Sequence, residues 1–177
     1  MLNVLLGDEL DEPGRYIAEV IYGANDGIVT TFAVVSGVAG AALDPRIVLV
    51  LGSANLFADG FSMGMSNYLS RRSEIDYRDA AGEDPAGDGK TPGKTAVATF
   101  LAFVAAGWTP LLPYIVGFEP LFALSIVVTG LAFFTVGAGR SLVTERSWYR
   151  NGGEMLVVGM LAASVAYLVG SLLAGVA

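Results

Sequence analysis

The sequence contains neither cysteine nor histidine, and only 15% of its residues are charged. Disulfide bonds and metal sites built from thiolate or imidazole ligands are therefore excluded. The net charge of −7 argues against a nucleic-acid partner. No Ser/Lys, metal-histidine or paired-carboxylate arrangement indicates catalysis, so we expect neither an enzyme nor a permanently bound cofactor.

Hydrophobic residues make up 54% of the chain and are gathered into long runs. A helix needs about 20 mostly apolar residues to cross the ~30 Å hydrocarbon core. Five runs reach this length, at 21–43, 47–69, 95–118, 121–139 and 155–177. The sequence therefore predicts an all-α membrane protein with five transmembrane helices in residues 21–177. Residues 1–20 read as an amphipathic N-terminal segment rather than a cleavable signal peptide.

Positive charge is divided unevenly between the connections. All Lys and Arg residues except Arg46 fall on the side of the N-terminus. The positive-inside rule then places the N-terminus and the 71–94 connection in the cytoplasm and the C-terminus outside. The 71–94 connection is also acidic, so it either concentrates cations or is simply a solvated, flexible loop.

Polar residues interrupt the second run within NLFADGFSMGMSNY, residues 55–68. Asp59 lies near the middle of that run, where a charge costs at least ~2.5–3.5 kcal/mol on insertion scales and must face protein or water. Asn55, Asp59, Met63 and Asn67 recur at every fourth residue, which aligns them on one helix face. This polar stripe either lines an ion path or joins helices through hydrogen bonds.

The first run carries a single charge, Asp26, about 9 Å from its centre. Met63 is displaced by a similar amount on the second run, and the short connection predicts that the two runs are antiparallel neighbours. Asp26 and Met63 then lie at one depth. A carboxylate with a thioether and amide oxygens suits Fe²⁺ or Mn²⁺ better than Mg²⁺ or Ca²⁺. The alternative is that Met63 is an apolar gap-filler.

Small residues four apart, such as Gly23 with Gly27 and Gly60 with Gly64, predict close helix packing. The segment PLLPY, residues 110–114, predicts a kink in the third crossing. Two polar helices do not enclose a path alone, so we expect a parallel homodimer with both first helices around a common axis.

Four segments carry a family resemblance: YGANDGIVTTFAVVSGVAGA, ANLFADGFSMGMSNYLSRRSE, PLLPY and GGEMLVVGMLAASVAYLVG. In this order, over nearly all of the chain, they resemble the vacuolar iron transporter family. The resemblance implies a homodimer of five-helix protomers that exports ferrous iron from the cytosol in exchange for protons, along a path at the dimer interface. It places the pathway aspartate at Asp26 and the pathway methionine at Met63. It also implies a plasma (inner) membrane in a prokaryote or a vacuole-type membrane in a eukaryote.

Two departures from the family pattern bear on this expectation. Asn55 stands where many members carry a glutamate, and Asp59 supplies a carboxylate one turn further on. Eukaryotic members insert a long metal-binding domain, rich in glutamate and methionine, between the second and third helices, where this chain has only its short connection. Glu74, Asp76 and Asn67 are therefore our candidates for a metal entrance.

The hypothesis from sequence is export of Fe²⁺, with Mn²⁺ as a second candidate substrate. Asp26, Met63, Asn55 and Asp59 are the expected metal ligands, and exchange of metal for proton on Asp26 or Asp59 would couple transport to a proton gradient. One alternative is a passive divalent-cation channel without proton coupling. Another is a membrane scaffold whose buried polar stripe only holds subunits together.

Overall fold

The computed structural model describes residues 14–85, 89–142, 144 and 146–175, so the predicted N-terminal segment lies largely outside the described residues. The described residues form helices and their connections without any strand, which confirms the all-α prediction. The elements are α3 (Ile17–Gly40), α4 (Pro45–Ala80), α5 (Pro92–Gly107), the 3₁₀ turn η2 (Thr109–Leu111), α6 (Leu112–Val116), α7 (Leu121–Gly139), the 3₁₀ turn η3 (Arg140–Leu142) and α8 (Trp148–Leu173).

Two of the helix starts follow directly from local sequence. The carboxylate of Asp44 accepts the backbone N–H of Arg46 at 2.8 Å just before α4, and Pro45 occupies the first turn, where its missing N–H costs nothing. Thr91 and Pro92 repeat the arrangement at the start of α5. Both connections therefore end where a capping residue precedes a proline.

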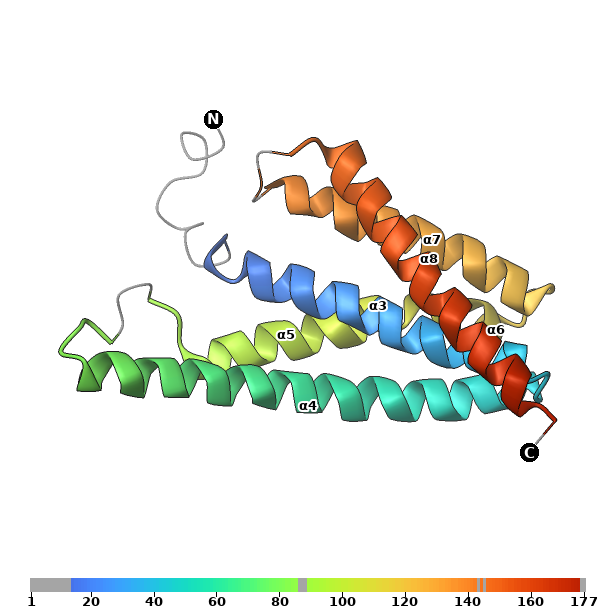
Figure 1. Ribbon diagram of the computed structural model, residues 1–177, viewed down its shortest axis with the longest axis horizontal. Helices are drawn as coiled ribbons and strands as arrows, with labels where there is room; N and C mark the ends of the chain where they lie inside the picture. Colours follow the sequence, from blue (N-terminus) through green and yellow to red (C-terminus); the bar gives the residue numbers. More distant parts are fainter. Residues whose placement is uncertain (1–13, 86–88, 143, 145, 176–177) are drawn as a thin grey trace.

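The long helices lie side by side, as Figure 1 shows. The first turn of α3, the α4–α5 connection and the α7–α8 connection gather at one end, which we call the N-terminal end of the bundle. The α3–α4 turn, α6 and the chain's last described residues lie at the other, the C-terminal end. This is the arrangement expected of a chain that crosses a membrane an odd number of times.

Four helical segments of the described chain are long and apolar enough to cross a membrane: Pro45–Ala80, Pro92–Val116, Leu121–Leu142 and Trp148–Leu173. The chain is therefore an integral, multi-pass membrane protein. Helix α3 is not among the four, because Asn25 and Asp26 lower its hydropathy. Its 24 residues span about 36 Å, more than the ~30 Å hydrocarbon core, so the fifth crossing stays a prediction.

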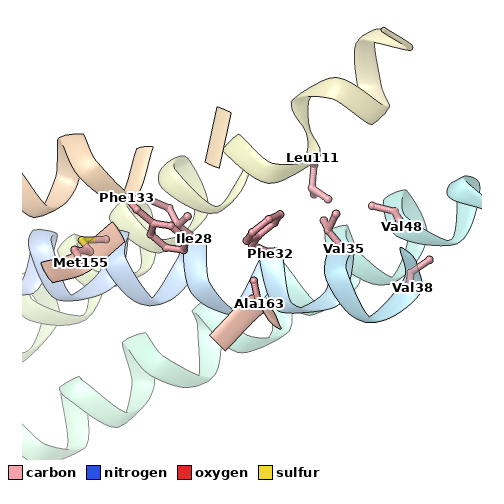
Figure 2. Packing of buried hydrophobic residues seen from close by; sticks show 9 residues of the cluster. All are labelled: Ile28, Phe32, Val35, Val38, Val48, Leu111, Phe133, Met155 and Ala163. Atoms are coloured by element: carbon pink, nitrogen blue, oxygen red, sulfur yellow. The ribbon is translucent and has the colours of Figure 1, made fainter. Parts of the chain in front are cut away.

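Helix α3 forms the centre of the bundle and packs against α4, α5, α7 and α8. Its apolar side chains Ile28, Phe32 and Val35 are fully buried, and Figure 2 shows them with the other cluster members along this helix. The rings of Phe32 and Phe133 meet edge to face with centroids 6.4 Å apart, a favoured aromatic geometry. The core thus fixes the position of the helix that carries Asp26.

Glycines allow the close helix approaches that the small-residue spacing predicted. A Cβ at Gly23 or Gly27 would collide with the backbone of α5, at the carbonyls of Thr99 and Phe103. On α4, Gly60 faces the ring of Phe103 at 3.0 Å. The predicted glycine pairs of α3 and α4 therefore both pack against α5.

We expect Gly27→Ala to lower the stability of the folded protein by about 1–3 kcal/mol, the usual cost of overpacking. The added methyl group would overlap the Phe103 carbonyl, which belongs to a helix backbone and does not move aside. Thermal unfolding in detergent measures the effect. Gly153→Ala is the matched control, because a Cβ there meets no atom within 4 Å and alanine favours the helix. An unchanged melting temperature for Gly27→Ala would contradict the prediction.

Two helix boundaries differ from the sequence prediction. Helix α4 continues through Arg71 and Arg72 to Ala80, so the first ten residues of the predicted 71–94 loop are helical. Ion pairs along the helix support this extension, with Glu74 bound by Arg71 and Arg78 at 2.7 and 2.6 Å.

Helix α8 begins at Trp148, seven residues before its predicted start. In the structure Ser147 is the N-cap residue, and Glu154 lies in the second turn facing Arg140 and Arg146 at 3.9 and 3.6 Å. The apolar run marked the start too late because Arg150, Asn151 and the two glycines before Glu154 are not hydrophobic, although they lie in the helix.

The predicted kink in the third crossing is present. Helix α5 ends at Gly107, and η2 and α6 continue the crossing through the PLLPY segment. The carbonyl of Pro110 accepts a 2.7 Å hydrogen bond from the hydroxyl of Ser125, a buried residue of α7. A carbonyl freed by the kink is thus satisfied inside the protein, as a lipid environment requires.

Candidate functional site

The side of α4 that packs against α5 determines where its polar residues lie. Every fourth residue of α4 from 48 to 64 is buried: Val48, Gly52, Leu56, Gly60 and Gly64. Gly60 and Gly64 face α5 directly, and Gly52 faces Leu111 just beyond it. Asn55, Asp59 and Met63 each precede one of these buried positions by one residue, which puts them about 100° around the helix. All three are partly buried, so the stripe flanks the α4–α5 contact instead of facing open lipid.

Asp26 and Asp59 form the centre of the candidate site. Both carboxylates are partly buried, and they are close enough to interact electrostatically across the α3–α4 contact. Among the described residues neither side chain has a hydrogen-bond or ion-pair partner. The hydroxyl of Thr30 donates a 2.9 Å hydrogen bond to Asp26, but to its backbone carbonyl. Two carboxylates thus lie together without a compensating positive charge.

Met63 lies one turn from Asp59, which is about 6 Å along α4 towards the N-terminal end. Asn55 lies the same distance on the other side. The stripe therefore offers, in order along the helix, an amide, a carboxylate and a thioether beside the carboxylate of Asp26. The predicted meeting of Asp26 and Met63 stays a prediction.

Asn67 has a structural partner. Its amide donates a 2.7 Å hydrogen bond to the hydroxyl of Thr99, which in turn donates to the carbonyl of Thr95. This links α4 to α5 and fits the alternative that parts of the stripe join helices.

The predicted entrance residues are only partly gathered. Asn67 and Glu74 line one pocket of about 280 Å³ at the N-terminal end of the bundle, whereas Asp76 is exposed and lies 3.9 Å from Arg72. The pocket lies between α3, α4 and α5 and is lined by Ala18, Glu19, Tyr22, Asn67, Ser70, Arg71, Glu74 and Thr95.

Sequence reasoning missed Glu19 in this pocket. Glu19 lies seven residues before Asp26, which is two helical turns on the same face of α3, so the spacing held a usable signal. It was passed over because it falls in the N-terminal segment, before the first apolar run.

One face of α3 is not covered by any helix of the described residues. Tyr22 is 55% exposed, and Asn25 and Asp26 on the same side are partly exposed. A second pocket, between α3 and α8, opens on this side and is lined by Asn25, Arg140 and Glu154 among others. No group of three or more Asp, Glu, His or Cys side chains in the described part of the chain is arranged to hold a metal ion. A single chain therefore presents an incomplete ligand set on an open face.

Comparison with known proteins gives relatives that cover most of the chain. The chain is 45% identical over 62 residues to the vacuolar iron transporter of Plasmodium berghei (strain Anka), a match that covers 35% of this chain and 23% of that protein. It is 27% identical over 176 residues to vacuolar iron transporter homolog 5 of Oryza sativa subsp. japonica, covering 92% and 83% of the two chains. Homolog 1 of the same plant is 30% identical over 170 residues, covering 86% and 72%.

The matches differ in extent. The Plasmodium match spans less than a quarter of that protein, whereas the plant homologs are matched over most of their length. The sequence profile of the VIT family matches residues 17–86 and 78–171, which include α3, α4 and the helices that pack on them. The chain therefore belongs to the VIT family.

Proposed function

We propose that this protein transports a divalent transition-metal ion across a membrane. Fe²⁺ is the main substrate in this proposal, and Mn²⁺ is a second substrate. Its relatives are named vacuolar iron transporters, which supports a transporter and not an enzyme. The membrane is the plasma (inner) membrane in a prokaryote or a vacuole-type membrane in a eukaryote. The metal ion is the substrate, held only during transport.

The observation that carries this proposal is the pair of unpartnered carboxylates, Asp26 and Asp59, in the helix bundle. A charged side chain at membrane depth is costly, and two like charges in one low-dielectric site repel. Such a pair is stable only when a cation or a proton compensates it. A transported cation meets this requirement without any fixed positive side chain, and a scaffold would gain nothing from the repulsion.

The donor types indicate the class of ion. Carboxylate oxygens from Asp26 and Asp59, a thioether from Met63 and an amide from Asn55 form a mixed oxygen and sulfur set. Mg²⁺ and Ca²⁺ prefer oxygen alone, whereas Fe²⁺ and Mn²⁺ accept intermediate ligand sets.

The incomplete ligand set on one chain supports a homodimer. A two-fold axis along the open face of α3 would bring two copies of Asp26 and Met63 together and double the number of ligands. It would also cover the partly exposed polar residues of α3, which are poorly suited to lipid.

The direction and coupling follow from charge. The positive-inside rule puts the N-terminal end of the bundle in the cytosol, so the ion enters there and leaves at the C-terminal end. When the ion leaves, a proton takes its place on Asp26 or Asp59. Metal and proton would then alternate on the same carboxylates, which makes the protein an antiporter.

The test is Fe²⁺ uptake into proteoliposomes with an acidic interior, with the internal pH followed at the same time. We expect Fe²⁺ to enter as the interior loses protons. Metal influx without proton movement would overturn the antiport step and favour a passive channel. Absence of both Fe²⁺ and Mn²⁺ influx would overturn the transport proposal and favour the scaffold.

We expect Met63→Leu to lower Fe²⁺ influx several-fold, because leucine keeps the volume but removes the sulfur ligand. Met65→Leu is the matched control, since Met65 is two residues away on the opposite side of α4 and is 40% exposed. Influx is measured in the same proteoliposomes. Equal Fe²⁺ influx for the two variants would assign Met63 a packing role instead.

A further inference from the structure

Three arginines gather around one glutamate at the start of α8. Arg140 and Arg146 lie 3.9 and 3.6 Å from the carboxylate of Glu154, and Arg150 precedes Glu154 by one turn of the helix. Among the described residues, Glu154 is the only carboxylate within ion-pair distance of any of these arginines. The arginine cluster, Arg140, Arg146 and Arg150, therefore keeps a net positive charge that the transport path does not explain.

The segment that carries the arginine cluster differs in charge from the other segments at this end of the bundle. Residues 140–154 contain three arginines and two glutamates, a net charge of +1. Residues 71–94 contain five basic and six acidic residues, and residues 1–20 contain one arginine and five acidic residues. Figure 1 shows the α7–α8 connection on the opposite side of the α3 start from the α4–α5 connection. Net positive charge at this end is thus confined to the α7–α8 side.

The guanidinium groups of the arginine cluster keep their hydrogen-bond donors. Both distances to Glu154 are too long for a hydrogen bond, and no other described residue accepts one from these three side chains. The side chain of Arg146 is 69% exposed, and the guanidinium of Arg150 lies 6.0 Å from the centre of the Tyr149 ring. Each guanidinium carries five N–H donors in a planar fork that matches the oxygens of a phosphate group. The free donors and the positive charge therefore fit a phosphate.

The arginine cluster lies at the depth of the lipid headgroups. The 26 residues of α8 span about 39 Å, which is about 9 Å more than the hydrocarbon core. Trp148 and Tyr149, next to Arg150, are 58% and 54% exposed, and exposed aromatic residues of this kind are typical of the membrane–water interface. The ring of Trp148 packs edge to face on Phe134 of α7, with centroids 5.9 Å apart. The first turn of α8 is thus held at the membrane surface.

An exposed apolar stripe of α8 runs from Arg150 towards the C-terminal end of the bundle. Val157, Leu161 and Leu168 follow Arg150 at intervals of seven, four and seven residues, which places all four on one face of the helix. The three apolar side chains are 58%, 62% and 59% exposed. This face therefore offers apolar surface along the membrane-spanning part of α8 and an arginine at the level of the headgroups.

We propose that the start of α8 binds an anionic phospholipid, with its phosphate on the arginine cluster and its acyl chains along the exposed stripe of α8. A soluble phosphate would use the arginines but not the stripe, which is why we assign the site to a lipid. The positive-inside prediction places this end of the bundle at the cytoplasmic leaflet, whose anionic lipids attract basic segments. The proposal goes beyond the proposed function and depends on none of the residues of the ion path.

The charge of the headgroup should decide which lipid binds. Phosphatidylglycerol and phosphatidylcholine carry the same phosphate, but phosphatidylcholine adds a positive choline group. The arginine cluster repels this second charge, and Glu154 alone compensates only part of the repulsion. A bound anionic lipid would also replace the long contacts to Glu154 by short, charge-assisted hydrogen bonds.

The test is lipid binding to the purified full chain in detergent, counted by native mass spectrometry. The two probes are phosphatidylglycerol and phosphatidylcholine with identical acyl chains. We expect the native chain to prefer phosphatidylglycerol by about tenfold or more, since one basic residue near an anionic surface contributes about fivefold. Arg146→Gln and Arg150→Gln should each lower the affinity for phosphatidylglycerol by about fivefold and change that for phosphatidylcholine much less.

Arg72→Gln is the matched control. Arg72 is a 62% exposed arginine at the same end of the bundle, but it lies 3.9 Å from Asp76 in a segment with more acidic than basic residues. We expect this variant to bind both lipids as the native chain does. Arg150→Lys keeps the charge without the fork and should retain part of the preference, which separates lipid binding from a folding defect.

Three results would overturn the proposal. The first is equal affinity of the native chain for the two lipids, and the second is an equal loss of preference in Arg72→Gln and Arg150→Gln. The third is displacement of phosphatidylglycerol by inorganic phosphate at the same concentration, because a soluble anion would then fill the site. A protein that prefers phosphatidylglycerol through Arg146 and Arg150 but shows no metal flux would refute the transport proposal and leave this one standing.

Discussion

Fe²⁺ influx should fall by about 30-fold or more in Asp26→Asn, whose side chain has the same size but no charge. Removing one member of a close charged contact costs roughly 2–5 kcal/mol, and each ~1.4 kcal/mol is a factor of ten. The folded bundle should survive, because the side chain of Asp26 forms no hydrogen bond or ion pair with the described residues, and the bond from Thr30 goes to its backbone carbonyl. Influx into proteoliposomes and thermal unfolding in detergent measure the two quantities.

Asp79→Asn is the matched control for this experiment. It makes the same chemical change on α4, at an exposed side chain outside both the stripe and the pocket. We expect its influx to equal that of the native chain. Native influx in Asp26→Asn would remove Asp26 from the path, and a fall in both variants would point to a general effect of surface charge.

Much of the fold could be predicted from the sequence because lipid imposes a simple rule. A crossing must be apolar over about 20 residues, so the runs marked four of the helices directly. The fifth run, 21–43, predicted α3 in the same way, although Asn25 and Asp26 keep the hydropathy of this helix low. The kink at PLLPY was predictable because proline removes a backbone donor.

The helix ends were less predictable, because hydrophobicity does not mark where a helix stops outside the membrane. Helix α4 continues to Ala80 through ion pairs between residues three and four apart. Those pairs were present in the sequence, but the change from apolar to charged residues at Arg71 suggested a loop. Membrane boundaries and helix boundaries are set by different forces.

The candidate site could be predicted only in part from the sequence. Asp26 and Asp59 were identifiable because a charge in an apolar run is costly. Their closeness depends on how α3 and α4 rotate, and the glycines that pack both helices against α5 decide this. Glu19 and Lys90 are 71 residues apart, and only the folded chain brings them together.

We expect opposite effects of Asp59→Asn on stability and on transport. The carboxylates of Asp26 and Asp59 interact as like charges without a positive partner in the described chain, so the variant should unfold at a higher temperature than the native protein when no metal is present. Added Mn²⁺ should stabilise this variant less than it stabilises the native protein. A ligand at 100 times its dissociation constant adds about 2.7 kcal/mol to the free energy of unfolding, but only while its binding site is intact. Fe²⁺ influx should be lower in Asp59→Asn than in the native protein.

The scaffold hypothesis predicts the reverse for this variant. If Asp59 holds subunits together, its removal lowers the melting temperature and shifts the protein towards monomer in detergent sizing, with no metal effect in either protein. Melting curves with and without Mn²⁺ therefore separate the two explanations in one experiment. A destabilised variant with unchanged response to Mn²⁺ would count against a metal role for Asp59.

A double variant tests whether Asp59 replaces the glutamate that many family members carry one helical turn earlier, at the position of Asn55. The family resemblance places a glutamate at Asn55 in many members, whereas this chain has its carboxylate at Asp59, about 6 Å further along the helix. Glutamate is longer than aspartate by one methylene and reaches part of that distance. Asn55→Glu combined with Asp59→Asn should therefore regain a measurable share of the Fe²⁺ influx lost in Asp59→Asn alone. Recovery would mean that the path needs a carboxylate on this face of α4 but tolerates its position; no recovery would mean that the site depends on the closeness of Asp59 to Asp26.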